Sequence, residues 1–454
     1  MAKVCIFCGA AKGNLPCHGL GSRDYVNASP TRPLRKARPM RRSIIAAALS
    51  LAVAGSSLIA LPAAQAAGPL PEPAFGMHVP TISIGTDPGV TYGSIRLWDS
   101  GITWGQVEQK KNFYWWNGMD AAIGNANTQN VQILYVLGGT PTWAATNKKQ
   151  GTYPNKGAAS VPKMKDWKSW VNAVTKRYGD SIESYQIWNE ADLTNFWAGT
   201  PKQMADLTKA AAKIIRKNDP TAKIVSASST VRLASSYKRF FPAYLKALKK
   251  AKWPVDVIAV HTYPDGKGNP GTRVDYIEKV QGDMKKAKVP ASKALWDTEV
   301  NYGIRGPGKV KGQSITGAQA ASWVAQTYLD NILLGVERSY WYYWAPADNL
   351  IGITLQDGTT GAVGYQTVNQ WLAGSYYTCG TVSGTNVCQL GNNDNPEAIA
   401  WVSQGSGTYT VPANATVQCD ALNNCSAVTP GTQVTIGNMP LWFGTPAGQA
   451  ANLQ

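Results

Sequence analysis

Tyr-Gln-Ile-Trp-Asn-Glu (185–190) and Leu-Trp-Asp-Thr-Glu-Val (295–300) are the two stretches that decide how this chain is interpreted. Each is a short apolar, β-rich run that ends at a glutamate, Glu190 or Glu299, so each predicts a carboxylate at the C-terminal end of a buried strand. Parallel β/α barrels carry their active sites at that end of their strands. Two carboxylates about 5 Å apart are the catalytic groups of a retaining glycosidase, and this is the chemistry that the pair indicates.

Strand-like and helix-like segments alternate about eight times around these two motifs. The strands are predicted from short runs rich in Val, Ile, Tyr and Trp, as expected for strands buried on both faces. They are 75–79, 94–99, 131–137, 182–188, 223–227, 255–260, 294–298 and 338–344. Amphipathic helices are predicted at 167–178, 201–217, 237–252, 274–288 and 316–334. This pattern predicts an α/β fold, a (β/α)8 TIM barrel over 67–375. An open doubly wound sheet, the alternative, would gather its ligand at one crevice, whereas here catalytic-type residues end several strands.

The composition changes after the barrel. Residues 376–454 are rich in Thr, Val, Gly and Asn and lack helical periodicity, with strands predicted at 398–402, 408–411, 415–418 and 433–436. This predicts a small all-β sandwich domain. The segment holds Cys379, Cys388, Cys419 and Cys425. An even number of cysteines in an exported chain predicts two disulfides, and of the three possible connectivities we favour 379–388 with 419–425.

The N-terminal region has the features of a targeting segment. Six basic residues between positions 32 and 42 precede an apolar run over 44–61, and Ala64-Gln65-Ala66 follows. This predicts a secretory signal peptide over 40–66, cleaved after Ala66, and therefore a secreted, extracellular protein without a membrane span after cleavage. Residues 1–39 do not fit ahead of such a signal, so we interpret them as a misassigned extension, with Met40 as the natural start.

Charge and metal-ligand spacing exclude other classes of protein. The formal net charge is +17, but residues 1–66 contribute +8 of it and leave +9 for the rest. That balance suits work near acidic polymers or an anionic cell surface. No predicted helix presents a basic stripe for phosphates, so no nucleic-acid partner is expected. Cys5, Cys8, Cys17 and His18 have part of the spacing of a zinc site, but no second pair of ligands with matching spacing follows them. We therefore predict neither a metal nor a cofactor.

The order of these motifs along the predicted strands resembles clan A of the glycoside hydrolases, the retaining (β/α)8 barrels. That clan places Asn-Glu after its fourth strand and a second Glu at the end of its seventh. The resemblance covers about 70–375 and an appended β-domain, and Ala191 departs from it where many members have proline. It implies that Glu190 is the general acid/base and Glu299 the nucleophile. It further implies that the substrate-binding residues include Asn189, Arg96, His261, Tyr263 and Trp344.

Three further expectations concern the surroundings of the carboxylates. Trp143 and Trp197 fall in loops on the catalytic face, where their rings could stack on sugar rings. Strand alternation places Asp297 on the same inward face as Glu299. Lysines and arginines in the loops after the third and seventh strands fit either an anionic polysaccharide or an ordinary solvated surface.

These observations together predict a secreted retaining glycoside hydrolase that cleaves a polysaccharide or oligosaccharide by double displacement. One alternative is a non-catalytic carbohydrate-binding barrel, which the presence of both glutamates disfavours. Another is a transglycosylase that uses the same glycosyl-enzyme intermediate, with a sugar in place of water as acceptor. The sequence leaves open the sugar, endo or exo action, the role of the C-terminal domain and the oligomeric state.

Overall fold

The computed structural model describes residues 71–306, 311–345, 350–391 and 397–452. The expected signal peptide, the extension before it and the cysteines within that extension lie outside the described residues. Among the helices that are described, none has the length and apolar character needed to cross a membrane.

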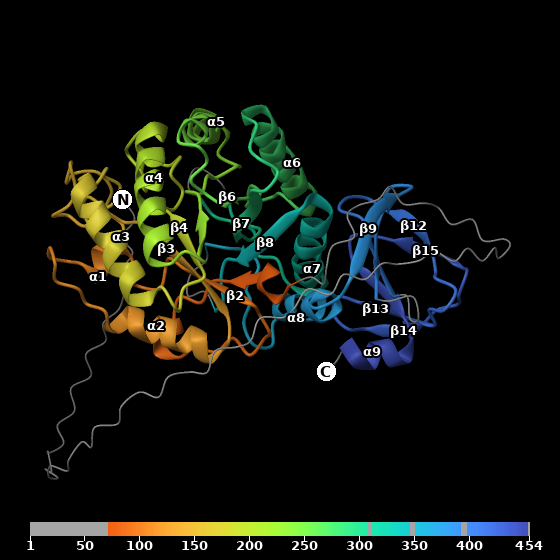
Figure 1. Cartoon of the computed structure of the whole chain (residues 1–454). Coiled ribbons are helices and arrows are strands. Elements are labelled where there is room, and N and C mark those ends of the chain that lie inside the picture. Colours follow the sequence, from red (N-terminus) through yellow and green to blue (C-terminus); the bar gives the residue numbers. More distant parts are fainter. Residues whose placement is uncertain (1–70, 307–310, 346–349, 392–396, 453–454) are drawn as a thin grey trace, which may run out of the picture. The chain divides into compact units, whose positions relative to one another are not determined.

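Eight parallel strands close into a barrel in the order in which they occur in the chain (Figure 1). They are β1 (Phe75–Met77), β2 (Ser94–Leu97), β3 (Gln132–Leu137), β4 (Ser184–Ile187), β5 (Lys223–Val225), β6 (Val257–His261), β7 (Ala294–Val300) and β8 (Val336–Trp341). Each corresponds to one of the eight predicted strands, so the predicted TIM barrel is confirmed. β8 pairs with β1 and closes the ring.

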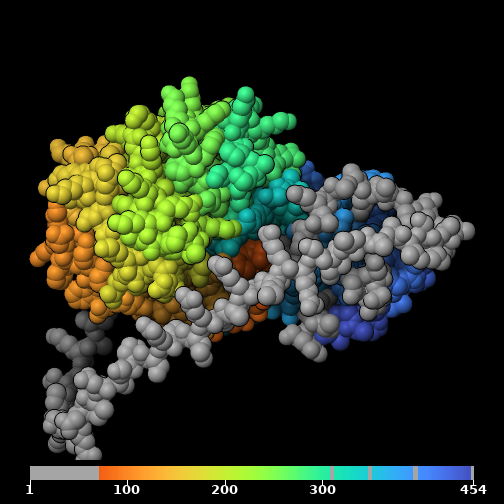
Figure 2. All heavy atoms as spheres, viewed as in Figure 1, coloured from red at the N-terminus to blue at the C-terminus, as the bar shows by residue number. Residues whose placement is uncertain are grey.

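Helices cover the outside of the barrel. They are α1 (Trp104–Val107), α2 (Asn117–Thr128), α3 (Met164–Tyr178), α4 (Pro201–Asn218), α5 (Ala234–Lys250), α6 (Pro270–Ala287), α7 (Gly317–Leu334) and α8 (Thr360–Leu372), with short 3-10 helices at η1 (Glu72–Ala74) and η2 (Ile82–Ile84). The start of α4 shows why the chain becomes helical there. Thr200 and Gln203 form a capping box and Pro201 occupies the first turn, where its missing N–H costs nothing. Neighbouring helices α3, α4 and α5 present a continuous outer surface (Figure 2).

The barrel interior is filled by side chains from alternate strand positions. Leu134, Val225, Ala259, Trp296 and Tyr340 belong to one buried cluster inside the ring. The opposite faces of the strands pack against the helices in a second, larger cluster. Because both faces are buried, the strands need continuous apolar runs, which is the pattern that made them detectable in the sequence.

The C-terminal domain is antiparallel. Its strands are β9 (Tyr377–Val382), β10 (Thr385–Leu390), β11 (Glu397–Trp401), β12 (Gly407–Thr410), β13 (Val417–Asp420), β14 (Cys425–Ala427), β15 (Gln433–Ile436) and β16 (Leu441–Gly444), followed by helix α9 (Pro446–Asn452). A six-stranded sheet in the order β14-β13-β16-β11-β10-β9 faces the two-stranded sheet β12-β15. Val387, Val411, Ile436 and Phe443 pack between the two sheets, which confirms the predicted all-β domain.

Both predicted disulfides are confirmed, with the favoured connectivity. Cys379–Cys388 joins β9 to β10, and Cys419–Cys425 joins β13 to β14. In each pair the two cysteines lie directly opposite each other in neighbouring strands. Each bridge therefore fixes the register of a hairpin.

Side chains of α7 reach the C-terminal domain. Asp330 Oδ1 accepts hydrogen bonds from Trp401 Nε1 at 2.8 Å and from Ser403 Oγ at 3.1 Å. Gln326 and Ser322 both donate to the carbonyl oxygen of Asn438. The sandwich is thus tied to the helix that precedes β8.

Candidate active site

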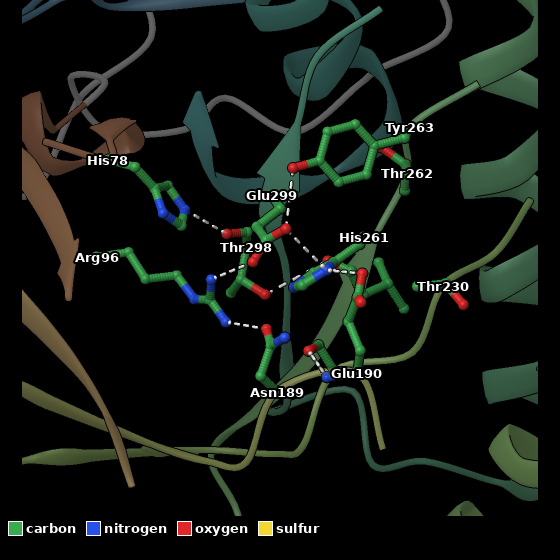
Figure 3. A network of polar contacts seen from close by, with 12 residues as sticks. His78, Arg96, Asn189, Glu190, Thr230, His261, Thr262, Tyr263, Thr298 and Glu299 are labelled. Carbon is green, nitrogen blue, oxygen red and sulfur yellow. Dashed lines mark hydrogen bonds and ion pairs between the residues drawn. The ribbon is translucent and has the colours of Figure 1, made fainter. Parts of the chain in front are cut away.

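The two predicted carboxylates meet in a cavity at the C-terminal ends of the barrel strands. The cavity has a volume of about 370 Å³, and its lining includes Asn189, Glu190, Tyr263 and Glu299. Figure 3 shows side chains from β2, β6 and β7 and from the segment after β4 converging on this point. The parallel arrangement explains the meeting, because all eight C-terminal strand ends share one rim of the barrel.

Arg96 on β2 connects three of these groups. Its side chain is buried, and the residue is only 1% exposed. Nη1 donates to Glu299 Oε1 at 2.6 Å and Nη2 donates to Asn189 Oδ1 at 2.8 Å (Figure 3). Nε donates to Gln186 Oε1 at 2.7 Å. Charge-assisted bonds in three directions fix the planar guanidinium, and through it the orientation of the Glu299 carboxylate.

The second oxygen of Glu299 is also held. Tyr263 Oη donates to Glu299 Oε2 at 2.9 Å, and His261 Nδ1 lies 3.3 Å from the same oxygen (Figure 3). Burial raises the pKa of Glu299, and the charge of Arg96 opposes that effect. Burial also raises the pKa of Tyr263, so its hydroxyl stays protonated and remains a donor. The hydrogen bonds from Arg96 and Tyr263 favour the ionised carboxylate and fix its position, whereas burial acts against ionisation.

Glu190 has a different environment. Its Oε1 lies 3.0 Å from His261 Nδ1, and its backbone N–H donates to Ser228 Oγ at 2.9 Å. Burial raises the pKa of Glu190 to about 7, although Arg232 and Arg96 lower it. Burial lowers the pKa of His261 to about 3, so the imidazole is neutral near pH 7. A carboxyl group that titrates near neutrality can both donate and accept a proton there.

Glu190, His261 and Glu299 each offer a polar atom within 4.8 Å of the other two. A separation of about 5 Å between two carboxyl groups is the geometry of retaining glycosidases, whereas inverting enzymes leave a wider gap for water. The same three residues could by distance ligate a metal ion. However, the Arg96 guanidinium already contacts Glu299 and supplies a positive charge at this place.

The expectation for Asp297 is wrong, and the reason is a bulge in β7. Asp297 pairs with Val260 of β6, but the next residue of β6, His261, pairs with Glu299. Thr298 is therefore an extra residue, and the register against β8 shifts by one residue over the same interval. Asp297 turns outward and binds Arg273 of α6, at 2.9 Å from Nη2. The bulge allows Glu299 to face the cavity even though Asp297 does not.

The three predicted tryptophans are not part of the cavity lining. Trp197 is buried and packs against Trp188, with ring centroids 5.1 Å apart. Trp143 donates from its indole nitrogen to the carbonyl oxygen of Glu108 at 2.8 Å. Trp344 is buried beyond the end of β8. The aromatic side chains that line the cavity are instead Trp98, Tyr153, Phe196, Tyr263 and Tyr342.

Sequence reasoning missed three polar residues of the site: Gln186, Ser228 and Arg232. Gln186 bridges Arg96 and Thr298 inside the barrel, and a polar residue in the middle of a buried apolar strand was the available signal. Ser228 and Arg232 follow β5, a strand whose end carries no acidic residue. A search for polar residues after every predicted strand would have found both.

Comparison with known proteins relates part of this barrel to one family of glycosyl hydrolases. Residues 100–297 match the sequence model of glycosyl hydrolases family 39. A β-xylosidase of Geobacillus stearothermophilus is 22% identical over 182 residues, which cover 38% of this chain and 35% of that enzyme. The matched segment thus spans about a third of the length of this curated relative.

Solved structures share the fold. A family 39 glycoside hydrolase from Bacteroides cellulosilyticus WH2 superposes with a TM-score of 0.62 at 16% identity, covering 83% of this chain and 81% of that one. A β-xylosidase of family 39 from Caulobacter crescentus gives a TM-score of 0.61 at 17% identity, covering 85% and 98%. The predicted barrel fold is confirmed by these structures, and within it residues 100–297 are similar to glycosyl hydrolases family 39.

Proposed function

We propose that this chain, whose barrel carries a family 39 glycosyl hydrolase domain, is a secreted retaining glycosidase that acts by double displacement. The observation that carries the proposal is the unequal pair of carboxylates on either side of His261. Glu299 accepts hydrogen bonds from Arg96 and Tyr263, which favour its ionised form although burial raises its pKa. Glu190 has no cation in direct contact, and burial raises its pKa to about 7. Two carboxyl groups with such different hydrogen-bond partners can divide the roles of nucleophile and acid.

In the first step Glu299 attacks the anomeric carbon and forms a glycosyl ester. The bond to the leaving sugar breaks at the same time, and the leaving oxygen takes the proton of Glu190. The Asn189 amide nitrogen remains available to donate to a sugar hydroxyl, because its Oδ1 is engaged by Arg96. Arg96 and Tyr263 keep the attacking oxygen in place without rearrangement.

In the second step Glu190, now ionised, takes a proton from water, and the resulting hydroxide attacks the anomeric carbon. The ester to Glu299 breaks and the free carboxylate returns to Arg96. Two inversions at one carbon give net retention of configuration. The neutral His261 lies between the two carboxyl groups, with Nδ1 3.0 Å from Glu190 Oε1 and 3.3 Å from Glu299 Oε2. Its Nδ1–H can therefore donate to whichever of the two is ionised at each step.

The substrate that we propose is a polysaccharide or oligosaccharide with a xylose-like glycone. The support is the name of the relatives, which include β-xylosidases from two organisms. Secretion is supported by the leader-like sequence over 40–66 and by the two disulfides, because disulfides persist in oxidising compartments.

The test is the configuration of the first product formed from an aryl xyloside, followed by NMR before mutarotation. We expect retention, with turnover abolished in Glu299→Ala and unchanged in Glu337→Gln. The latter removes a carboxylate whose contacts are with Lys223 and Arg338, away from the cavity. Inversion of configuration, or normal turnover by Glu299→Ala, would refute the assignment. Transfer to added sugar in preference to water would instead favour the transglycosylase.

A further inference from the structure

Arg232 is a cation in the wall of the cavity that takes no part in the two proposed reaction steps. It lies between β5 and α5, lines the same cavity as both carboxylates, and is only 8% exposed. Its Nη2 donates to the carbonyl oxygen of Gly306 at 2.6 Å. Among the described residues, its Nε and Nη1 have no hydrogen-bond partner, and no carboxylate forms a salt bridge with it. Buried arginines are normally paired, so the two nitrogens of Arg232 without a partner are suited to binding an anion.

The guanidinium geometry favours an anion with two oxygens. Arginine carries five N–H bonds in a planar fork, and Gly306 accepts one from Nη2. If that hydrogen lies on the Nε side, the edge formed by Nη1 and Nη2 keeps two parallel N–H bonds. If it lies on the Nη1 side, the edge formed by Nε and Nη2 keeps them. In either case one edge can bind a carboxylate or a sulfate ester in bidentate fashion.

The position of Arg232 assigns the anion to one side of the scissile bond. Ser228, four residues before Arg232 in the segment after β5, accepts a hydrogen bond from the backbone N–H of Glu190 at 2.9 Å, and the charge of Arg232 lowers the pKa of Glu190. Glu299 instead forms its ion pair with Arg96. The group that protonates the leaving oxygen faces the leaving sugar. A cation on the Glu190 side of the cavity therefore faces the leaving sugar, and not the sugar that is attached to Glu299.

We propose that Arg232 forms a subsite for an anionic group on the leaving sugar, so that the preferred substrate is an acidic glycan. The inference rests on the proposed glycosidase function and adds the chemical class of its substrate. A uronic acid carboxylate and a sulfate ester share the required pair of oxygens. Asp99, Glu190 and Glu299 make the rest of the cavity acidic, so an anion is accepted only where Arg232 offsets that charge.

The test uses three disaccharides with one glycone and different leaving sugars: glucuronic acid, glucose and glucose 6-sulfate. We expect the full chain to cleave at least one acidic disaccharide about 10- to 100-fold better in kcat/KM than the neutral one, the effect of a hydrogen-bonded charge pair. Whichever acidic substrate is preferred identifies the anion. Arg232→Gln should bring the ratio close to one, and Arg232→Lys should keep part of it. Arg305→Gln removes an exposed arginine of a neighbouring loop and should leave the ratio unchanged.

A binding experiment separates this inference from the proposed function. Sodium D-glucuronate, D-glucose and glucose 6-sulfate are titrated into Glu299→Gln, with and without Arg232→Gln. Binding of an acidic sugar that is lost with Arg232→Gln supports the subsite even if no disaccharide is hydrolysed. Equal ratios in wild type and Arg232→Gln, or a wild-type preference for the neutral disaccharide, would overturn the subsite. In that outcome normal hydrolysis of the neutral disaccharide would leave the glycosidase assignment intact.

Discussion

Replacement of Glu190 by glutamine tests the division of roles most directly. The side chain of Glu190 is 13% exposed and its Oε1 lies 3.0 Å from His261 Nδ1. Glutamine has the same shape and keeps an oxygen that can accept from His261, so only the ionisable proton is lost. A positioned general acid contributes about 10²- to 10⁴-fold to the rate, which corresponds to roughly 3–5 kcal/mol of barrier.

That contribution depends on the leaving group. A sugar alkoxide is a poor leaving group and needs the full contribution, whereas a nitrophenolate departs without protonation. We therefore expect Glu190→Gln to slow the first step by about 10²- to 10⁴-fold with a sugar leaving group and by much less with nitrophenol. The assay is pre-steady-state release of the leaving group, because the second step also loses its general base in this variant.

The pH dependence gives an independent readout. Burial raises the pKa of Glu190 to about 7. The acid must be protonated to act, so the activity of the wild type should fall as the pH rises through about 7. In Glu190→Gln this basic limb should disappear. An equal loss for sugar and nitrophenol leaving groups, together with an unchanged basic limb, would refute the acid role of Glu190.

Two further predictions concern Glu299 and the C-terminal domain. Tyr263→Phe removes the hydroxyl that donates to Glu299 Oε2 and favours the ionised form of Glu299. The pKa of Glu299 should therefore rise further, so the acid limb of the kcat/KM profile should move to higher pH and the maximum of kcat/KM should fall about tenfold. A pH profile that superimposes on that of the wild type would contradict a role for this hydrogen bond. Replacing Cys379 and Cys388 together by alanine opens a loop of sequence separation 9. This should lower the free energy of unfolding of the sandwich, measured by urea denaturation, by about 2–3 kcal/mol. No change would show that the disulfide does not reduce the conformational entropy of the unfolded chain.

The barrel was predictable because its strands are buried on both faces. Continuous apolar runs such as the one in β3 (Gln132–Leu137) are sufficient to locate strands, and the order of strands in a TIM barrel follows the chain. The C-terminal domain was less predictable in detail. β14 (Cys425–Ala427) is exposed at all three positions, so it carries no apolar signal, and it was not among the predicted strands.

Side-chain direction was the main source of error at the site. The sequence predicts the loops that carry Trp143 and Trp197, but whether an indole faces the sugar or the core depends on contacts with distant residues. The Trp143 indole is held by the carbonyl oxygen of Glu108, a partner 35 positions earlier in the chain. Tyr342 lines the cavity and Trp344 does not. A pattern of residues along one strand cannot give such differences, because they arise from how the loops after several strands pack together.

The bulge at Thr298 explains both the error over Asp297 and the chemistry of the site. With strict alternation, Asp297 and Glu299 would share a face, and the bond between Asp297 and Arg273 would turn both carboxylates toward the helices. One extra residue separates their directions. Asp297 can then tie β7 to α6, while Glu299 reaches Arg96 of β2 and Tyr263 after β6. In the sequence Trp-Asp-Thr-Glu the glutamate can therefore face the cavity only if the strand is irregular. The register of β7 shifts against both of its neighbours, β6 and β8, at this position.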